Sequence, residues 1–358
     1  MPTLEVKPGI SLFYLDSGAP GDPLANDTQQ QAYITLFMLH GHSFHSPIFN
    51  RAIAVAHKYN IRFVAITRRD YHGSSLLTSE DIKAVTHGST EQRIQTFTER
   101  AGEIMEFIKE FIDKNNIPPN SGTGGGGFSL SGWSLGNLQG FSVLAFGNRF
   151  PDLVEKLTPY FRSYISYETT VVFTPPIDVY HPLADESVPK EERGTYFCHW
   201  ISSYFDHPPE GIATGDPTLL NQTTPSTTKP SSYSQFTDEE REAIIDNKPS
   251  LRADIFFFRI DPQVNTDILR HAFTQQDDSP APPAWPNVPA RSLWCSETAW
   301  SVIFSLRETE RWVVRINEEN KGRWVRPYDS ICVEGGNHFL HWDEPDKFLE
   351  KTKELMML

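Results

Sequence analysis

The stretch that decides the fold reads Ser-Leu-Ser-Gly-Trp-Ser-Leu-Gly-Asn and occupies residues 129–137. Its centre has the pattern G-x-S-x-G, in which a strand turns abruptly into a helix with Ser134 at the apex. Gly132 and Gly136 omit Cβ atoms where two backbones nearly touch. Ser134 is then expected at the carboxyl edge of a sheet, beside the Leu135 amide at a helix N-terminus. The same pattern also occurs as a simple turn of small residues, so its meaning depends on partners elsewhere.

Length and composition bound the class of protein. The chain has 358 residues, enough for one large α/β domain with an insertion, and a formal net charge of -14 that argues against a nucleic-acid or membrane partner. Cys198, Cys295 and Cys332 are widely spaced and read as free thiols in a reducing compartment. Neither a signal peptide nor an apolar run of about 20 residues is visible. A cytoplasmic protein is expected.

Apolar runs and helical periodicity alternate along both ends of the chain. An opening hairpin is expected over residues 4–16. Buried strands are predicted at 34–39, 61–66, 128–132, 161–167, 291–295 and 330–334, and helices at 47–58, 90–114, 137–150, 306–321 and from 345 onward. This alternation requires a parallel, doubly wound sheet.

The region from 169 to 289 has a different character. Prolines cluster there, helical patches are predicted at 190–205, 238–247 and 262–276, and residues 223–234 are low in complexity and expected to be mobile. We interpret 169–289 as a cap inserted between two sheet strands. Residues 1–168 and 290–358 then form the two parts of the core.

A serine hydroxyl needs a base to accept its proton and donors for the oxyanion that forms on attack. His338 is the candidate base, because it follows the last strand on a Gly-Gly-Asn loop; His341 is the nearest rival. The oxyanion donors are expected to be the amide of Leu135 and that of His42 or Ser43, which follow a buried strand that ends at His40-Gly41. His40, His42 and His45 could instead suggest a metal site, but no carboxylate accompanies them.

The acid that orients the base has three candidates. Glu168 directly follows the strand at 161–167 and is preferred, because a carboxylate at that sheet edge can reach the histidine. Glu297 lies in the loop after the resumed strand, where this chain offers Thr298 or Ala299 in place of an aspartate. Asp178 is the third candidate. In the loop after the strand at 61–66, Arg68, Arg69 and Asp70 are expected to pair with one another.

With these parts in view, the chain resembles the α/β-hydrolase superfamily over nearly its full length. The resemblance rests on His40-Gly41, the segment 69–74, the motif at 132–136 and the segment 334–339. It looks most like fungal members with a Gly-Trp-Ser-Leu-Gly-Asn turn, and the glutamate placement is similar to that of haloalkane dehalogenases and zearalenone-type lactonases. The resemblance implies an α/β-hydrolase fold: a mostly parallel, doubly wound sheet with an inserted, largely helical cap. Ser134 departs from the aspartate of dehalogenases and epoxide hydrolases.

Aromatic residues indicate an apolar pocket. The segment 196–205 is apolar around much of a helix, so Trp200 and Tyr204 either pack on the core or line a substrate cavity with Phe44 and Trp133. The expected activity is that of a serine hydrolase on an ester, lactone or thioester of a small, largely apolar molecule, through a Ser-His-Glu triad and without metal or organic cofactor. Two alternatives stay open: a carbon–carbon bond hydrolase or acyl-transfer enzyme of secondary metabolism, and a receptor-like binding protein. The sequence does not specify the substrate or the oligomeric state.

Overall fold

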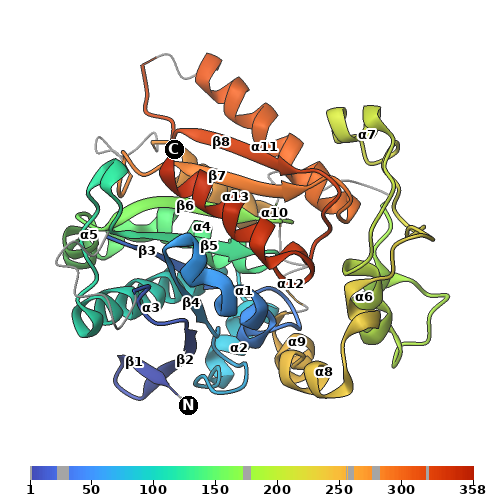
Figure 1. Cartoon of the computed structure of the whole chain (residues 1–358), viewed down its shortest axis with the longest axis horizontal. Coiled ribbons are helices and arrows are strands. Elements are labelled where there is room, and N and C mark those ends of the chain that lie inside the picture. Colours follow the sequence, from blue (N-terminus) through green and yellow to red (C-terminus); the bar gives the residue numbers. More distant parts are fainter. Residues whose placement is uncertain are drawn as a thin grey trace.

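A single eight-stranded sheet forms the centre of the computed structural model, which describes residues 2–21, 32–171, 179–254, 256, 262–275, 283–319 and 322–358 (Figure 1). Its strand order is β1-β2-β4-β3-β5-β6-β7-β8. The strands are β1 (Thr3–Lys7), β2 (Ile10–Asp16), β3 (Ile34–Leu39), β4 (Ile61–Ile66), β5 (Phe128–Trp133), β6 (Phe161–Tyr167), β7 (Ala290–Cys295) and β8 (Tyr328–Val333).

The first two strands are antiparallel to their neighbours and all later pairs are parallel. Every residue of β3, β4, β5 and β7 is buried, as expected for strands covered on both faces, whereas β8 at the edge is largely accessible. The predicted mostly parallel, doubly wound sheet is therefore confirmed. The continuous apolar runs predicted β3, β4 and β6 with their observed bounds.

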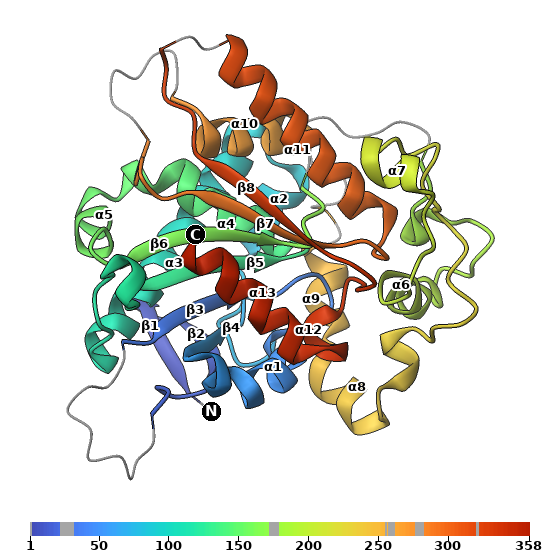
Figure 2. The same ribbon diagram turned by 45° about the horizontal axis from the view of Figure 1, so that its top comes forward.

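Helices cover both faces of the sheet (Figures 1 and 2). On one face α3 (Thr90–Asn115), α4 (Gly136–Phe146) and α10 (Pro262–Phe273) share a hydrophobic cluster. On the other, α1 (Asn50–Val55) packs against β4, and α13 (Pro345–Met357) packs against β6, β7 and β8. The remaining core helices are α2 (Ser79–His87), α5 (Pro151–Leu157), α11 (Trp300–Glu319) and α12 (Leu340–Asp343).

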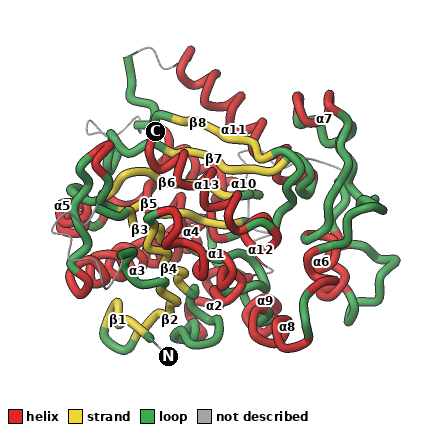
Figure 3. Tube along the Cα trace, in the orientation of Figure 1, coloured by secondary structure: helices red, strands yellow, loops and turns green. Residues whose placement is uncertain are grey.

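Within the described residues of 169–289, four α-helices lie outside the sheet layers: α6 (Arg193–Ile201), α7 (Pro209–Thr214), α8 (Asp238–Ile244) and α9 (Asn247–Arg252). Figures 1 and 3 place them together on one side of the sheet. The patch at 262–276 differs from the expectation, because its helix α10 packs on α3 and α4. Its apolar residues, among them Ile268 and Phe273, are buried in the core that those helices form. By its contacts α10 belongs to the helical layer of the core.

The low-complexity segment at 223–234 is anchored in the structure, in contrast to the mobility expected from its composition. The Ser226 amide donates to Tyr204 O at 2.7 Å, and the Lys229 ammonium lies 2.6 Å from Glu297 Oε2. Ser232 is buried and its hydroxyl donates to Asp343 at 2.6 Å. Side-chain and backbone partners from the core therefore order a stretch whose own residues carry no periodic pattern.

We expect Gly136→Ala to destabilise the protein. A Cβ on Gly136 would lie 2.5 Å from Leu39 O and 2.6 Å from His40 O, both of them backbone atoms that cannot move aside alone. The cost should be about 3 kcal/mol of unfolding free energy, measured by urea denaturation. Gly194→Ala in α6 is the control, because no atom lies within 4 Å of its added Cβ. An equal stability for Gly136→Ala and wild type would contradict the prediction.

Candidate active site

Ser134 occupies the turn between β5 and α4 and adopts the left-handed conformation with a φ of 52°. Its amide donates to Tyr167 O at 3.1 Å, and its carbonyl accepts from the Asn137 amide at 3.1 Å. Ser134 is half-buried, whereas Trp133 and Leu135 on either side are buried. A non-glycine residue held at positive φ is strained and is typical of functional sites. The turn thus presents a serine side chain at the carboxyl edge of the sheet.

Glu168 follows the last residue of β6 and also has a positive φ, of 50°. Its Oε1 accepts from the Cys295 amide at 2.7 Å, while its Oε2 accepts from the Thr298 hydroxyl and lies 2.9 Å from His338 Nδ1. The carboxylate is fully buried. These contacts make Glu168 the hydrogen-bond acceptor that orients the His338 ring.

His338 is 1% exposed, and its Nε2 is buried without a hydrogen-bond partner among the described residues. A buried ring nitrogen normally has a partner, so an unsatisfied one is a feature that calls for an explanation. With Nδ1 bound to Glu168, the neutral ring carries its proton on Nδ1 and leaves Nε2 as an acceptor. Nε2 is therefore available to take a proton.

The other candidates for acid and base have different surroundings. Glu297 is paired with Lys229, at 2.6 Å, and does not bond His338. Asp178 lies outside the described residues. His341 is a core residue: its Nδ1 lies 3.1 Å from Tyr167 Oη, its ring packs against Trp133, and burial lowers its pKa well below the ordinary value.

The turn that follows β3 abuts the serine. A Cβ on Gly41 would lie 3.0 Å from Ser134 Cβ. Ser43 has a φ of 64°, and its amide donates to Tyr71 Oη at 3.1 Å. Of the three amides expected to hold an oxyanion, that of Ser43 thus already has an acceptor. Leu135 follows Ser134 in the chain, and His42 follows Gly41, which contacts Ser134 in space.

Of the three histidines of this turn, His40 has no ring nitrogen left to bind a metal ion. Both ring nitrogens of His40 are engaged: Nδ1 with Gly41 O at 2.9 Å, and Nε2 as acceptor of the Arg68 amide at 3.0 Å. Burial and the nearby Arg68 hold the pKa of His40 well below its ordinary value. Among the residues that the structure describes, no three His, Cys, Asp or Glu side chains are grouped as metal ligands.

Two of the four predicted pocket residues, Trp133 and Phe44, contact the histidine loop directly. The Trp133 indole donates to His338 O at 3.0 Å, and Phe44 packs against Phe339 with 4.9 Å between ring centroids. The Trp200 indole donates to Gln222 O at 2.9 Å. Tyr204 donates to Asp343 at 2.8 Å. Their role toward a substrate stays a prediction.

Sequence reasoning missed the residues that hold Glu168 and the loop of His338. Thr298 donates to Glu168, and Asn337 beside His338 donates to Ser202 O at 2.8 Å and to Ser232 Oγ at 3.0 Å. The one local signal is the position of Thr298, which stands in the loop after β7 in place of an aspartate. Ser202 and Ser232 lie in the insertion far from His338 in sequence, so only packing brings them together.

The charged residues after β4 pair elsewhere, not with one another as expected. Arg68 binds Asp254, Arg69 lies 3.4 Å from Glu103, and Asp70 binds Arg252. Each of the three side chains therefore has a partner that is distant in the sequence. Two of the partners, Asp254 and Arg252, come from the insertion.

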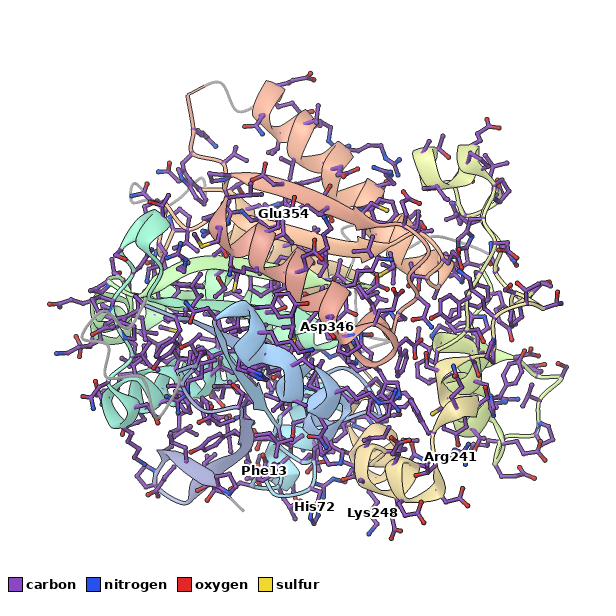
Figure 4. The ribbon with its side chains drawn as sticks, viewed as in Figure 1. Phe13, His72, Arg241, Lys248, Asp346 and Glu354 are labelled. Atoms are coloured by element: carbon purple, nitrogen blue, oxygen red, sulfur yellow. The ribbon has the colours of Figure 1, made fainter. Side chains whose placement is uncertain are left out.

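A cleft of about 920 Å³ lies between the loop after β4 and the helices α8 and α9. Tyr71, His72, Asp246 and Lys248 are among its lining residues, and Ser134 and His338 are not. His72 and Lys248 lie near each other at the lower edge of the molecule (Figure 4). This cleft is therefore separate from the serine and histidine.

The chain matches a known protein family over most of its length. Residues 36–351 match the profile of a family described as "Alpha/beta hydrolase family". No curated protein matches the sequence. No helix in the described ranges combines the length and the apolar character needed to span a bilayer.

Several solved structures are similar to the whole chain. A serine hydrolase from the polyaromatic hydrocarbon-degrading bacterium Cycloclasticus zankles has 12% identity and a TM-score of 0.54, with 99% of this chain and 96% of that chain covered. Cfl2 from Burkholderia cenocepacia has 12% identity and a TM-score of 0.54, with coverage of 99% and 94%. Haloalkane dehalogenase DatA from Agrobacterium tumefaciens C58 has 12% identity and a TM-score of 0.50, with coverage of 97% and 93%. At these identities the likeness shows the fold.

The buried histidines predict a pH-dependent stability. Burial lowers the pKa of His45 from 6.5 to about 4, and it lowers those of His40 and His341 as well. The unfolded chain therefore binds more protons between pH 6.5 and 4, and stability is lost as pH falls through this window. His45 alone should contribute a loss of about 3 kcal/mol. Unfolding free energies from urea titrations at several pH values measure this slope.

His45→Gln should weaken the dependence of the unfolding free energy on pH. His57→Gln, a change at an exposed histidine, should leave that dependence as in wild type. An unchanged slope for His45→Gln would contradict the assignment of the buried neutral ring.

Proposed function

Because the chain belongs to the alpha/beta hydrolase family, we propose that it is a serine hydrolase in which Ser134, His338 and Glu168 form the catalytic triad. The observation that carries the proposal is the buried pair of His338 Nδ1 and Glu168 Oε2 at 2.9 Å, which leaves Nε2 unsatisfied beside the strained serine turn. A carboxylate, a histidine with one open nitrogen and a serine at the apex of the turn are the parts that acyl transfer requires.

In the proposed reaction His338 Nε2 accepts the Ser134 proton as the hydroxyl attacks the acyl carbon. Glu168 keeps the proton of the neutral ring on Nδ1 and stabilises the positive ring that forms. Thr298 and the Cys295 amide bond the same carboxylate and prevent it from turning away. His338 then protonates the leaving group, and water activated by the same nitrogen releases the acid.

The oxyanion is held by the Leu135 amide at the N-terminus of α4 and by the amide of His42. Leu135 follows Ser134 directly, and the contact between Gly41 and Ser134 places the turn at the serine. We prefer His42 to Ser43 because the Ser43 amide donates to Tyr71. Two aligned N–H donors at developing negative charge typically contribute a large part of the rate.

The proposed substrate is an ester, lactone or thioester of a small, largely apolar molecule, and the insertion is proposed to cap it. The ring centroids of Phe197 in α6 and of His42 are 5.6 Å apart, so an apolar helix of the insertion reaches the oxyanion turn. Trp133, Phe339 and Phe44 surround the His338 loop with buried aromatic rings. Such surroundings favour an apolar acyl or alcohol group over a charged one.

The triad serine is tested with a fluorophosphonate probe and p-nitrophenyl esters of several chain lengths. Wild type should form one covalent adduct by intact mass and turn over esters, and Ser134→Ala should lose both. Ser121→Ala, a change at an exposed serine, is the matched control and should behave as wild type. A folded wild type without adduct or turnover would contradict the proposal.

The acid is tested by Glu168→Gln and Glu297→Gln. Glu168→Gln keeps the shape but offers His338 the wrong partner for its Nδ1 proton, so kcat should fall roughly 10³–10⁴-fold. Glu297→Gln should change kcat little, because Glu297 is paired with Lys229. Steady-state kinetics on the same ester decide, and a large loss for Glu297→Gln alone would contradict the assignment of Glu168.

A further inference from the structure

We propose that Tyr71 and Asp254 are positioning residues that hold the 41–43 turn against Ser134, so that the insertion completes the oxyanion site. This inference rests on the proposed function. It concerns a cluster of four buried side chains behind the turn: His42, Arg68, Tyr71 and Asp254.

Tyr71 connects the turn to the insertion through its hydroxyl. Its Oη accepts the Ser43 amide at 3.1 Å and donates to Asp254 Oδ2 at 2.5 Å. The ring packs edge-on against His40 with 4.5 Å between centroids, and the side chain is 1% exposed. A single hydroxyl thus fixes the amide of a residue held at positive φ.

Arg68 binds the carbonyl side of the same turn. Its guanidinium donates to Gly41 O at 2.8 Å and to His40 O at 3.0 Å, while its other N–H groups reach Asp254 at 3.1 and 2.5 Å. The planar fork therefore spans two turn carbonyls and one carboxylate at once. Because the carbonyls are fixed, the amides that follow them in the chain are oriented as well.

Asp254 supplies the countercharge from the insertion. Burial by itself would raise the pKa of Asp254, but Arg68 and His42 beside it hold that pKa well below its ordinary value. His42 Nδ1 lies 3.8 Å from Asp254 Oδ2. The carboxylate thus stays charged and keeps both Arg68 and Tyr71 in place. Removal of its charge would leave a buried guanidinium unpaired, which is costly.

Backbone contacts from the insertion reach the same turn from its other side. The Asp246 amide donates to Ser43 O at 2.8 Å, and the His45 amide donates to Ile244 O at 3.0 Å. Phe44 and Ile245 form an isolated antiparallel bridge between them. The turn is consequently held between Asp254 on one side and residues 244–246 on the other, both from the inserted region.

Tyr71→Phe is the decisive variant, because it removes one hydroxyl and keeps the ring. We expect kcat on a p-nitrophenyl ester to fall 10- to 100-fold, somewhat less than on removal of a direct oxyanion donor. KM should change less than two-fold, since oxyanion donors stabilise mainly the charge that develops in the transition state. Fluorophosphonate labelling of Ser134 should slow by the same factor as kcat. Asp254→Asn, which keeps the shape and removes the charge, should likewise lower kcat with little change in KM.

Tyr328→Phe is the matched control. Tyr328 in β8 also loses one hydroxyl bond, to Ser292 at 2.7 Å, but it lies outside the cluster and should keep wild-type kcat. Thermal unfolding of all three variants shows whether they are folded. A kcat for Tyr71→Phe within two-fold of that for Tyr328→Phe would overturn the proposal, and so would a rise in KM without a fall in kcat. A wild type that reacts with neither probe contradicts the proposed function instead.

Discussion

The close approach of backbones at the turn after β5 is the constraint on which the rest of the site depends. A Cβ on Gly132 would lie 2.6 Å from Asn137 Cα, so the strand and helix can meet this tightly only with glycine there. The tight turn lets the Asn137 side chain donate to Ser134 O at 2.9 Å and to Tyr167 O at 3.0 Å. The same contact therefore fixes the serine turn and the end of β6, where Glu168 follows.

The position of the acid follows from strand order. β7 lies between β6 and β8, so a carboxylate at the end of β6 must cross the end of β7 to meet a histidine that follows β8. The Cys295 amide and the Thr298 hydroxyl, both from the end of β7, bond Glu168 along this path. The Glu168 carboxylate thus accepts two hydrogen bonds from this loop in addition to its contact with His338. This arrangement keeps a buried charge satisfied and leaves one oxygen directed to the imidazole.

Residues of 169–289 hold both the 41–43 turn and the loop of His338, while Ser134, His338 and Glu168 lie outside that region. Asp254 reaches the oxyanion turn through Arg68 and Tyr71, and Ser232 reaches the histidine loop through Asn337 and Asp343. Since these side chains are buried, apart from the half-buried Asp343, a loose insertion would leave several polar groups unpaired. The energetic cost of that loss couples the order of the cap region to the geometry of the site.

The sequence by itself determined the elements whose signal is local. Continuous apolar runs defined β3, β4 and β6, the G-x-S-x-G pattern located the serine turn, and the Gly-Gly-Asn loop located His338, because burial and backbone conformation act on neighbouring residues. Tertiary structure decided that Glu168 meets His338 while Glu297 pairs with Lys229, that the Ser43 amide already has an acceptor, and that α10 lies on the core. It also ordered residues 223–234. Each of these depends on partners distant in the chain, and no local pattern records them.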